Sequence, residues 1–288
     1  MSYAEPDEIK KWQRTDWNAA APGWRKWESQ FLQNLQPLTD MLAAEAGIKS
    51  GYKVLDMATG TGEPALTLAE AVGPKGSIVG VDLSQGMLAV AKERAVARRL
   101  ENVTFLVNEN DDLPALHDNS FDAAVCRLGL MFMPDPVRVL ASIRRVLRPH
   151  ARVAVAVWGP PEKVPFFTTS SKIVAKHFPE MKRVPPGTAG GPFGIPSQEM
   201  LSDIFRGAGL AGFSSQWIHV DVIQNISPDE YWQVISEMGI GMVDLLAKSP
   251  PEKRKTVKDE VLQALSQMFP GGSVTMGGES LIGSGAKP

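Results

Sequence analysis

The segment from Val54 to Ala65 constrains the fold of this chain more than any other. It reads Val-Leu-Asp-Met-Ala-Thr-Gly-Thr-Gly-Glu-Pro-Ala, which is an apolar strand ending in a carboxylate and followed by a glycine turn. Gly60 and Gly62 can adopt positive φ and let a ligand approach the backbone closely. Pro64 suits the first turn of a helix, and apolar residues then continue until Gly73. The order of strand, loop and helix predicts a nucleoside-cofactor site.

Two classes of cofactor use a loop of this kind. Residues 60–65 satisfy the dinucleotide spacing G-x-G-x-x-G/A, and Asp82 follows at the expected distance of ~20 residues. Asp56 at the strand end and Glu63 beside the helix start would, however, face a pyrophosphate that needs bare N–H groups. Acidic side chains better suit S-adenosylmethionine, because it carries an ammonium and a sulfonium group. We therefore predict a methyl-donor site, with a dinucleotide site as the alternative.

The segment resembles motif I of the class I S-adenosylmethionine-dependent methyltransferases, in the family of the ubiquinone/menaquinone C-methyltransferases. The resemblance implies an α/β fold with a doubly wound, mostly parallel seven-stranded sheet of order 3-2-1-4-5-7-6 and an antiparallel last strand. Strands two, three and four are expected at 77–82, 103–107 and 121–126, and the last strand at 273–283. Ala58 replaces the first glycine of the family's motif I, and a methyl group still leaves room there for the cofactor.

The resemblance also assigns the donor-binding residues. Asp82 would accept hydrogen bonds from both ribose hydroxyls, and Arg127 would help to enclose the methionine end. Glu109 and Asn110 occupy the places where the family usually has an Asp-Ala pair that reads the adenine edge. The predicted cofactor-binding set is Asp56, Ala58, Thr59, Gly60, Gly62, Asp82, Leu83, Met87, Glu109, Asn110 and Arg127.

Aromatic residues gather before and after the predicted core. The first group consists of Trp12, Trp17, Trp24, Trp27 and Phe31, and it predicts a lid of two helices. A stretch rich in proline, glycine and phenylalanine after Trp158 predicts an acceptor-binding insertion, because loops at the carboxyl ends of the strands face the ligand crevice. Simple packing of these aromatics onto the sheet is the alternative. The predicted acceptor-binding residues are Trp17, Trp24, Phe132, Trp158 and Phe193.

These signals divide the chain into three parts. Residues 1–48 form the predicted N-terminal helical lid, and residues 49–158 the S-adenosylmethionine-binding Rossmann-like core. Residues 159–288 hold the remaining core strands, the acceptor-binding insertion and a helical cover. Helix starts are expected at Ser84 and Ser197, and Ser227 to Glu230 has the pattern of a capping box.

Charge, apolar content and cysteine content limit which binding partners and which cellular compartment we expect. A net charge of −2 gives no electrostatic footprint for nucleic acid, so we do not expect a nucleic-acid partner. The polar start lacks a signal-peptide core, and no apolar run approaches the ~20 residues of a spanning helix, which predicts no membrane association. The lone Cys126 lies in a predicted buried strand and suits a packing role in a reducing, cytoplasmic compartment. A monomer and a homodimer both remain open.

The expected chemistry is in-line attack of an acceptor atom on the sulfonium methyl group, for which positioning can supply most of the acceleration. No metal-ligand spacing and no Ser/His/Asp signature is present, so we expect no metal. His177 is the candidate general base if the acceptor is a phenol or an enolisable carbon. We predict methylation of an apolar or aromatic small molecule at oxygen or carbon. An NAD(P)-dependent reductase and a non-catalytic S-adenosylmethionine-binding regulator are the alternatives.

Overall fold

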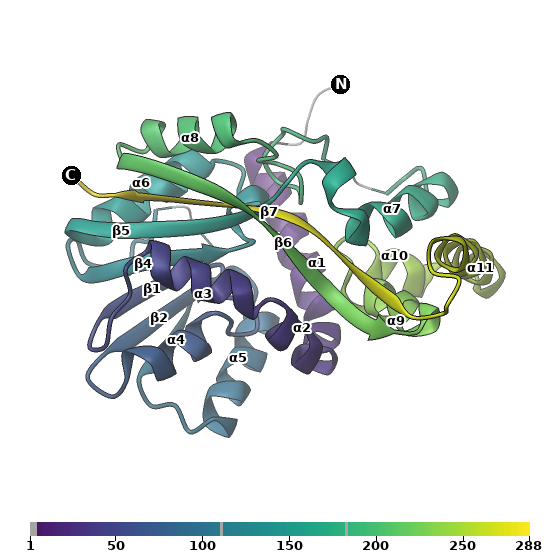
Figure 1. The fold of residues 1–288 in the computed structure, drawn as a ribbon, viewed down its shortest axis with the longest axis horizontal. Coiled ribbons are helices and arrows are strands. Elements are labelled where there is room, and N and C mark those ends of the chain that lie inside the picture. The colour runs from purple at the N-terminus through teal and green to yellow at the C-terminus, as the bar shows by residue number, and fades with distance from the viewer. Residues whose placement is uncertain (1–4, 110–111, 182–183) are drawn as a thin grey trace.

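The computed structural model describes residues 5–109, 112–181 and 184–288 (Figure 1). Within them a seven-stranded sheet has the order β3-β2-β1-β4-β5-β7-β6, which confirms the predicted topology. Strand β7 runs antiparallel between β5 and β6, and the other neighbouring pairs are parallel. The strands are β1 Lys53–Met57, β2 Ser77–Asp82, β3 Val103–Val107, β4 Phe121–Arg127, β5 Leu147–Trp158, β6 Ala211–Ile226 and β7 Val274–Ala286.

Helices cover both faces of this sheet. The side chain of Ser284 in β7 donates to Glu45 at the end of α3, whereas its neighbour Gly285 lies against Phe205 of α8. Because successive residues of a strand point to opposite faces, α3 and α8 cover opposite faces. The α-helices are α1 Pro6–Lys26, α2 Glu28–Asn34, α3 Gln36–Glu45, α4 Ala65–Val72, α5 Gln85–Ala97, α6 Pro136–Val146, α7 Pro165–His177, α8 Gln198–Gly207, α9 Pro228–Met238, α10 Val243–Lys248 and α11 Pro251–Met268, and the 3-10 helices are η1 Leu130–Phe132 and η2 Pro161–Lys163.

The three expected helix starts are confirmed. Ser84, Ser197 and Ser227 each accept a hydrogen bond from the backbone N–H three residues later. At Ser227 the side chain of Glu230 also returns to the backbone N–H of the serine, so the capping box is complete. These bonds satisfy N–H groups that have no partner inside the helix, and so they determine where α5, α8 and α9 begin.

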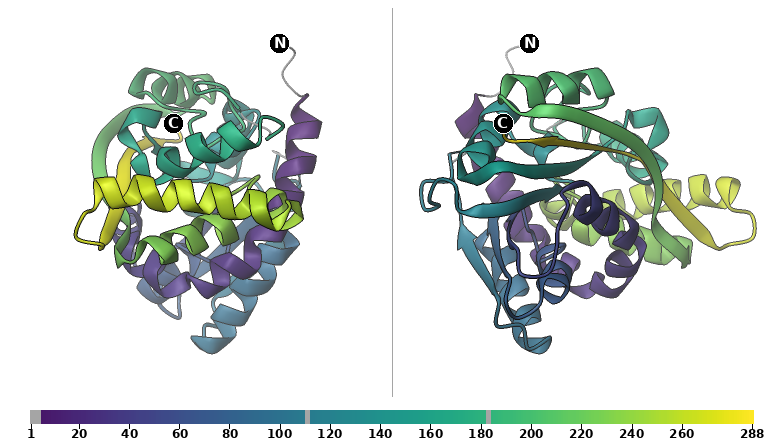
Figure 2. Two further views of the ribbon diagram at one scale, coloured as in Figure 1. Left: turned by 90° about the vertical axis from the view of Figure 1, so that its right-hand side faces the viewer. Right: turned by 60° about the vertical axis from the view of Figure 1, so that its left-hand side comes forward.

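The N-terminal lid contains three helices where the aromatic pattern predicted two. Trp27 ends α1 and precedes α2, and Leu35 separates α2 from α3 in the same way. Helix α1 packs against α5 on one side and against α9 and α10 on the other (Figure 2). Lys26 and the indole N–H of Trp27 both contact the carboxylate of Glu237 in α9, at 2.7 and 2.8 Å. The lid is therefore joined to the C-terminal helices.

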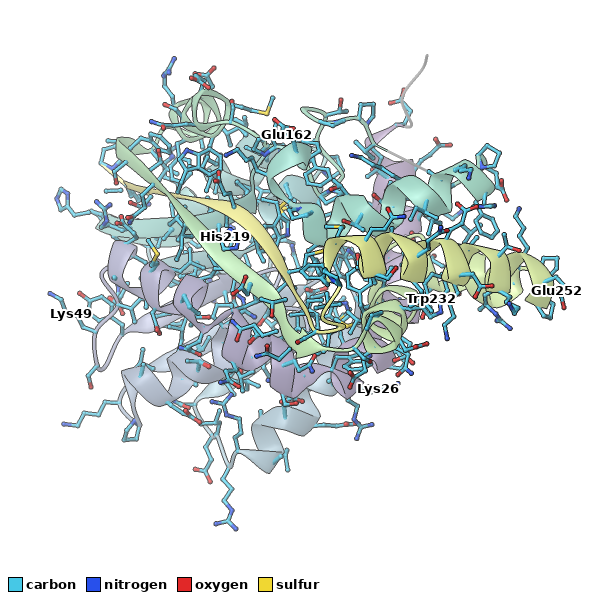
Figure 3. The ribbon with its side chains drawn as sticks, turned by 45° about the vertical axis from the view of Figure 1, so that its right-hand side comes forward. Lys26, Lys49, Glu162, His219, Trp232 and Glu252 are labelled. Carbon is cyan, nitrogen blue, oxygen red and sulfur yellow. The ribbon has the colours of Figure 1, made fainter. Side chains whose placement is uncertain are left out.

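The C-terminal half adds a helical cover beside the sheet. Strands β6 and β7 extend beyond their neighbours as a long ribbon, and α9, α10 and α11 lie at its far end (Figure 1). Figure 3 shows Trp232 on α9 close to α11, which carries Glu252 at its outer end. Because β6 and β7 complete the same sheet as β1 to β5, the boundary predicted at residue 158 separates roles rather than sheets. The three-part division itself stays a prediction.

The core lies between the sheet and its helices. Cys126 is buried and free, as expected, and burial raises the pKa of its thiol to about 12. Ala58, which replaces a family glycine in the motif I turn, has a φ of 57°, and His150 in β5 has a φ of 65°, so both occupy the left-handed region. Within the described ranges, no helix combines the length and the apolar character needed to cross a membrane.

Candidate donor and acceptor site

A cleft of about 250 Å³ lies where α1 crosses the carboxyl ends of β1 and β2. One wall belongs to the sheet and its loops, and the other to α1 and the segment after η1. The sheet side consists of Met57, Ala58, Val81, Asp82, Leu83, Asn108 and Glu109. The opposite side consists of Asp7, Lys10, Lys11, Gln13, Arg14, Met133 and Pro134. Four residues predicted to bind the donor, namely Ala58, Asp82, Leu83 and Glu109, therefore share one cavity.

Asp82 connects the first two strands of the site. One oxygen accepts from the backbone N–H of Gly60 at 2.8 Å, and the other from Ser84 at 2.9 Å. The burial of Asp82 raises the pKa of its carboxyl, while these backbone donors lower it. A carboxylate has about four acceptor positions, so two remain for a ligand. Asp82 can thus hold the glycine turn and bind hydroxyl groups in the cleft at once.

The glycine turn has the conformation that its residues predict. Gly60 and Gly62 have φ values of 55° and 102°, which favour glycine. A Cβ atom at Gly60 would meet no described residue within 4 Å, whereas one at Gly62 would lie 2.8 Å from Leu66. Gly60 therefore borders open space, and Gly62 allows α4 to pack closely behind the turn. The hydroxyl of Thr59 points to Asp56, at 2.6 Å, and not into the cleft.

Asp56 is fully buried in β1 and directly precedes Met57 and Ala58, which line the cleft. Its Oδ2 accepts from the hydroxyl of Thr59 and from the N–H of Ala65 at 3.1 Å, while Oδ1 has no hydrogen-bond partner among the described residues. Burial raises the pKa of Asp56 to about 7, although Thr59 and the positive charge of Arg127 act in the opposite direction. An unpartnered carboxylate oxygen at this place suits the ammonium group of S-adenosylmethionine.

The raised pKa of Asp56 makes stability depend on pH. From its ordinary value of 3.8 up to about 7, the folded chain holds a proton that the unfolded chain has lost. This contribution to stability is therefore present below pH ~4 and lost as the pH rises through ~7. Asp56→Asn lacks this titration. Raising the pH from 5 to 8 should therefore lower the free energy of unfolding of the wild type by about 3 kcal/mol more than that of Asp56→Asn. Urea unfolding at both pH values measures this difference, and parallel pH profiles would contradict the assigned pKa.

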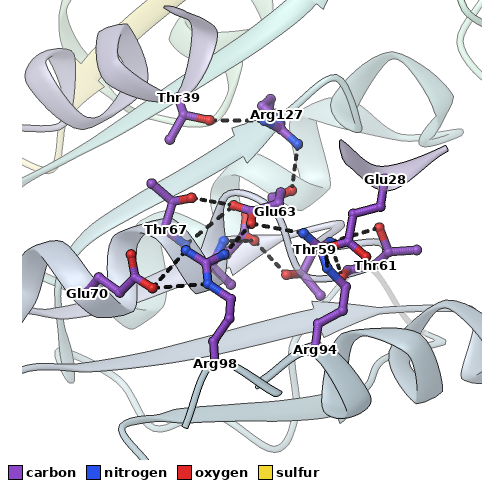
Figure 4. A network of polar contacts seen from close by, with 12 residues as sticks. Glu28, Thr39, Thr59, Thr61, Glu63, Thr67, Glu70, Arg94, Arg98 and Arg127 are labelled. Carbon is purple, nitrogen blue, oxygen red and sulfur yellow. Dashed lines mark hydrogen bonds and ion pairs between the residues drawn. The ribbon is translucent and has the colours of Figure 1, made fainter. Parts of the chain in front are cut away.

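Glu63 does not face the cleft, although its place beside the start of α4 predicted that it would face the cofactor. Its Oε1 is bound by Arg94 at 3.2 Å and by Arg98 at 2.8 Å, and its Oε2 by the hydroxyl of Thr67 (Figure 4). Arg127 lies nearby and donates to the carbonyl of Glu63 at 3.3 Å. The charge of Glu63 is thus neutralised within the protein. Asp56 and Glu63 were the two acids that argued against a pyrophosphate ligand. Within the described chain, only Asp56 of these two retains an unpartnered oxygen.

The remaining predicted donor residues lie around the cleft. Glu109 forms an ion pair with Arg14 of α1 at 2.8 Å, so the lid and the predicted adenine segment touch there. Met87 packs beneath α1 against Ala20 and does not line the cleft. Arg127 binds the hydroxyl of Thr39 as well as the Glu63 carbonyl, away from the cleft wall. Asn110 lies outside the described residues.

The predicted acceptor residues form two groups of touching rings. Trp17 stands edge-on to Phe132, with ring centroids 5.4 Å apart, and also contacts Trp24 at 6.2 Å. Phe167, which was not predicted, joins Trp158 and Phe193 with centroid distances of 5.6 and 6.4 Å. None of the five predicted residues lines the donor cleft, and their acceptor-binding role stays a prediction.

Gln13 links the lid, the donor cleft and the insertion, and the sequence reasoning did not single it out. Its side chain is nearly fully buried. Its amide donates to the carbonyl of Phe132 at 2.7 Å and to that of Gly190 at 2.9 Å. These bonds draw η1 and the glycine-rich loop after α7 onto α1. A buried amide that satisfies two carbonyls specifies the arrangement of all three segments.

His177 lies at the C-terminal end of α7, where its Nε2 is 2.9 Å from Glu260 of α11. It does not line the cleft, so the structure does not bring this candidate base to the donor site. Among the described residues, no group of three or more His, Cys, Asp or Glu side chains is arranged to hold a metal ion.

The residues of the cleft fit a nucleoside methyl donor. Asp82 has acceptor positions for the ribose, and Leu83 and Val81 offer apolar contact beside it. The open space at Gly60 leaves room for a ligand at the turn, and Asp56 provides an unpartnered acidic oxygen behind it. The chemistry of this donor set agrees with S-adenosylmethionine better than with a pyrophosphate.

Comparison with known proteins agrees with this geometry. Residues 48–193, just over half of the chain, match the family model of a methyltransferase domain. The chain is 33% identical over 173 residues to the demethylmenaquinone methyltransferase of Staphylococcus aureus, covering 58% of this chain and 70% of the relative.

Solved structures share the fold. A methyltransferase from Aquifex aeolicus that depends on S-adenosylmethionine superposes with a TM-score of 0.50, at 23% identity, over 76% of this chain and 94% of that chain. Phosphoethanolamine N-methyltransferase 2 of Haemonchus contortus, in complex with S-adenosyl-L-methionine, gives 0.57 at 20% identity, over 100% of this chain and 61% of its own. The chain therefore belongs to the class I S-adenosylmethionine-dependent methyltransferases, in the quinone-methyltransferase type that its motif I resembles.

Proposed function

We propose that this enzyme transfers the methyl group of S-adenosylmethionine to an oxygen or carbon atom of an apolar or aromatic small molecule. The observation that carries the proposal is the junction at Gln13. This residue lines the donor cleft and binds the backbone of Phe132, whose ring stands against Trp17. The Trp17–Phe132 pair is thus joined to the donor cleft through Gln13, although neither ring lines it. The relative from Staphylococcus aureus is named for demethylmenaquinone, an acceptor of the same class, which supports this choice.

The residues would act by binding and orientation. S-adenosylmethionine supplies an electrophilic methyl group on its sulfonium sulfur. Asp82 would hold the ribose and Asp56 the charged end, while α1 provides the opposite wall of the cleft. The aromatic rings would present the acceptor atom to the methyl group in line with the sulfur, which is the main requirement of such a displacement. No protein base is needed when the acceptor is itself an ionised phenol or an enolate.

The proposed partner is a small molecule and not a nucleic acid, because the net charge of −2 provides no basic surface for a phosphate backbone. We also propose that the reaction takes place in the cytoplasm. The buried free thiol of Cys126 supports a reducing compartment.

Methyl transfer to chosen acceptors tests the proposal. The enzyme and S-adenosylmethionine are incubated separately with a reduced naphthoquinone, a catechol and ethanolamine phosphate, and products are identified by mass spectrometry and NMR. We expect methylation of an aromatic acceptor, with NMR distinguishing ring carbon from oxygen. Trp17→Ala should raise the acceptor KM about tenfold and leave donor affinity unchanged. Trp217→Ala, at a 41% exposed position in β6, is the matched control. Methylation of the amine alone would overturn the proposed acceptor class.

A further inference from the structure

A buried arginine of α5 contacts both the N-terminal lid and the glycine turn (Figure 4). The side chain of Arg94 is 7% exposed, and its Nε forms an ion pair with Glu28 at the start of α2, at 2.6 Å. Its Nη1 donates to the carbonyl of Thr61 in the turn at 2.6 Å, and its Nη2 to Glu63 at 3.2 Å. One guanidinium therefore joins the first residue of α2 to the turn that borders the donor cleft.

The hydrogen bond from Arg94 ends on a part of the turn that is flanked by two glycines. Thr61 stands between Gly60 and Gly62, which both have positive φ and little steric restraint of their own. The bond from Arg94 fixes the peptide between them, and the hydroxyl of Thr61 adds a weaker contact at 3.3 Å. The planar, rigid fork of arginine donates in several directions at once, which a lysine ammonium on a flexible stem cannot reproduce.

A second arginine makes a parallel link. Arg127 at the end of β4 donates to the hydroxyl of Thr39 in α3 at 3.0 Å and to the backbone carbonyl of Glu63 at 3.3 Å. Two helices of the lid are thus tied to Glu63, one through its carboxylate and Arg94, the other through its carbonyl and Arg127. Both ties end on the turn that carries Gly60, whose N–H is bound to Asp82.

We propose that Arg94 is a positioning residue that couples the N-terminal lid to the shape of the donor-binding turn. The lid, through Glu28, holds Arg94 in the place where it supports Thr61, and the ordered turn then receives the donor. By thermodynamic reciprocity, the bound donor also holds the lid closed. Arg94 does not line the cleft and acts only through the turn. This inference rests on the proposed donor site.

Calorimetric titration of S-adenosylhomocysteine tests the coupling. Glu28→Gln removes the charge on the lid and leaves the contacts of Arg94 with the turn in place. We expect the Kd to rise about tenfold in Glu28→Gln and at least as much in Arg94→Lys. Glu70→Gln is the matched control, since Glu70 belongs to the same network but, among the described residues, pairs with Arg98, at 2.9 Å, and not with Arg94. Its Kd should stay within about twofold of the wild type.

Limited trypsin digestion provides a readout that a purely structural role would not move. Arg25 and Lys26 end α1 with exposed side chains, at 64% and 52%. In the wild type, S-adenosylhomocysteine should slow cleavage after them, and in Glu28→Gln this protection should be lost. If Glu28→Gln binds S-adenosylhomocysteine as tightly as the wild type and is equally protected from trypsin, the proposed coupling is wrong, whereas the donor site is still supported. If the wild type binds no S-adenosylhomocysteine, the donor site itself is overturned. Glu28 is partly exposed, so its variant remains testable even if Arg94→Lys fails to fold.

Discussion

Replacement of Asp82 by alanine is expected to weaken the binding of S-adenosylhomocysteine about 100-fold or more. Two acceptor positions of the carboxylate are occupied by the N–H groups of Gly60 and Ser84, and the other two are available to the ribose hydroxyls. Each hydrogen bond to a charged group contributes ~1.5–3 kcal/mol, and ~1.4 kcal/mol corresponds to a tenfold change in Kd. The loss of two such bonds accounts for the expected effect, and release of the glycine turn adds to it.

Two further variants separate binding from folding. Asp82→Asn keeps the size of the side chain but loses its charge and half of its acceptors, so an intermediate loss of about tenfold is expected. Asp122→Ala is the matched control, because Asp122 also accepts from a backbone N–H, that of Lys53, at the amino ends of the strands. Its donor affinity should stay near the wild-type value. Calorimetry on the folded proteins provides the measurement, and an Asp82→Ala variant that binds like the wild type would contradict the assignment.

A methyl group added at Gly129 is expected to destabilise the protein strongly. A Cβ atom there would lie 2.4 Å from the Cβ of Ala58 and 3.0 Å from the sulfur of Cys126. Neither atom ends a flexible side chain, so the backbone of the motif I turn must move. Overpacking of this kind costs ~1–3 kcal/mol. Gly129 has a φ of −108°, so the backbone conformation itself accepts alanine. The Gly129→Ala loss in free energy of unfolding would thus come from the contact with Ala58 and Cys126.

The same contact predicts a rescue. Ala58→Gly removes the clashing methyl group and relieves a left-handed alanine, a conformation that costs ~1–2 kcal/mol outside glycine. The double variant Ala58→Gly/Gly129→Ala should therefore recover most of the lost stability, with a coupling above ~1 kcal/mol in a double-mutant cycle from urea unfolding. Gly271→Ala is the control, since its Cβ would meet no atom of the described residues within 4 Å. A double variant no more stable than Gly129→Ala would show that Ala58 is not the obstacle.

Most of the fold could be predicted because its signals are local. The strand at Val54, the turn at Gly60 and the caps at Ser84 and Ser227 each depend on residues within one short segment, and the structure confirms them. The order of the strands came from the resemblance, since nothing in a strand's own residues specifies its neighbours. The split of the lid at Leu35 was not predicted, although Pro37 in the first turn of α3 is a local signal for it.

The α1 wall of the cleft could be predicted only in part from the sequence. Asp7, Lys10, Lys11 and Arg14 are spaced to lie on one face of α1, so the polar stripe itself was readable. That this stripe, and not the tryptophans, borders the donor cleft depends on how α1 docks. The environment of Glu63 could not be predicted from the sequence either. Its partners Arg94 and Arg98 are 31 and 35 residues away in the chain, so only the packing of α5 shows that its charge is already neutralised.

Titration of S-adenosylhomocysteine into the wild-type protein, with NADH and NADPH titrated in parallel, tests the central claim most directly. All three ligands carry an adenosine that Asp82 could hold, but only S-adenosylhomocysteine places an amino acid, and not a pyrophosphate, beside Asp56 and the glycine turn. The methyl-donor site predicts micromolar binding of S-adenosylhomocysteine and no binding of either dinucleotide. Binding of NADH or NADPH, with none of S-adenosylhomocysteine, would contradict it and make the cleft a dinucleotide site.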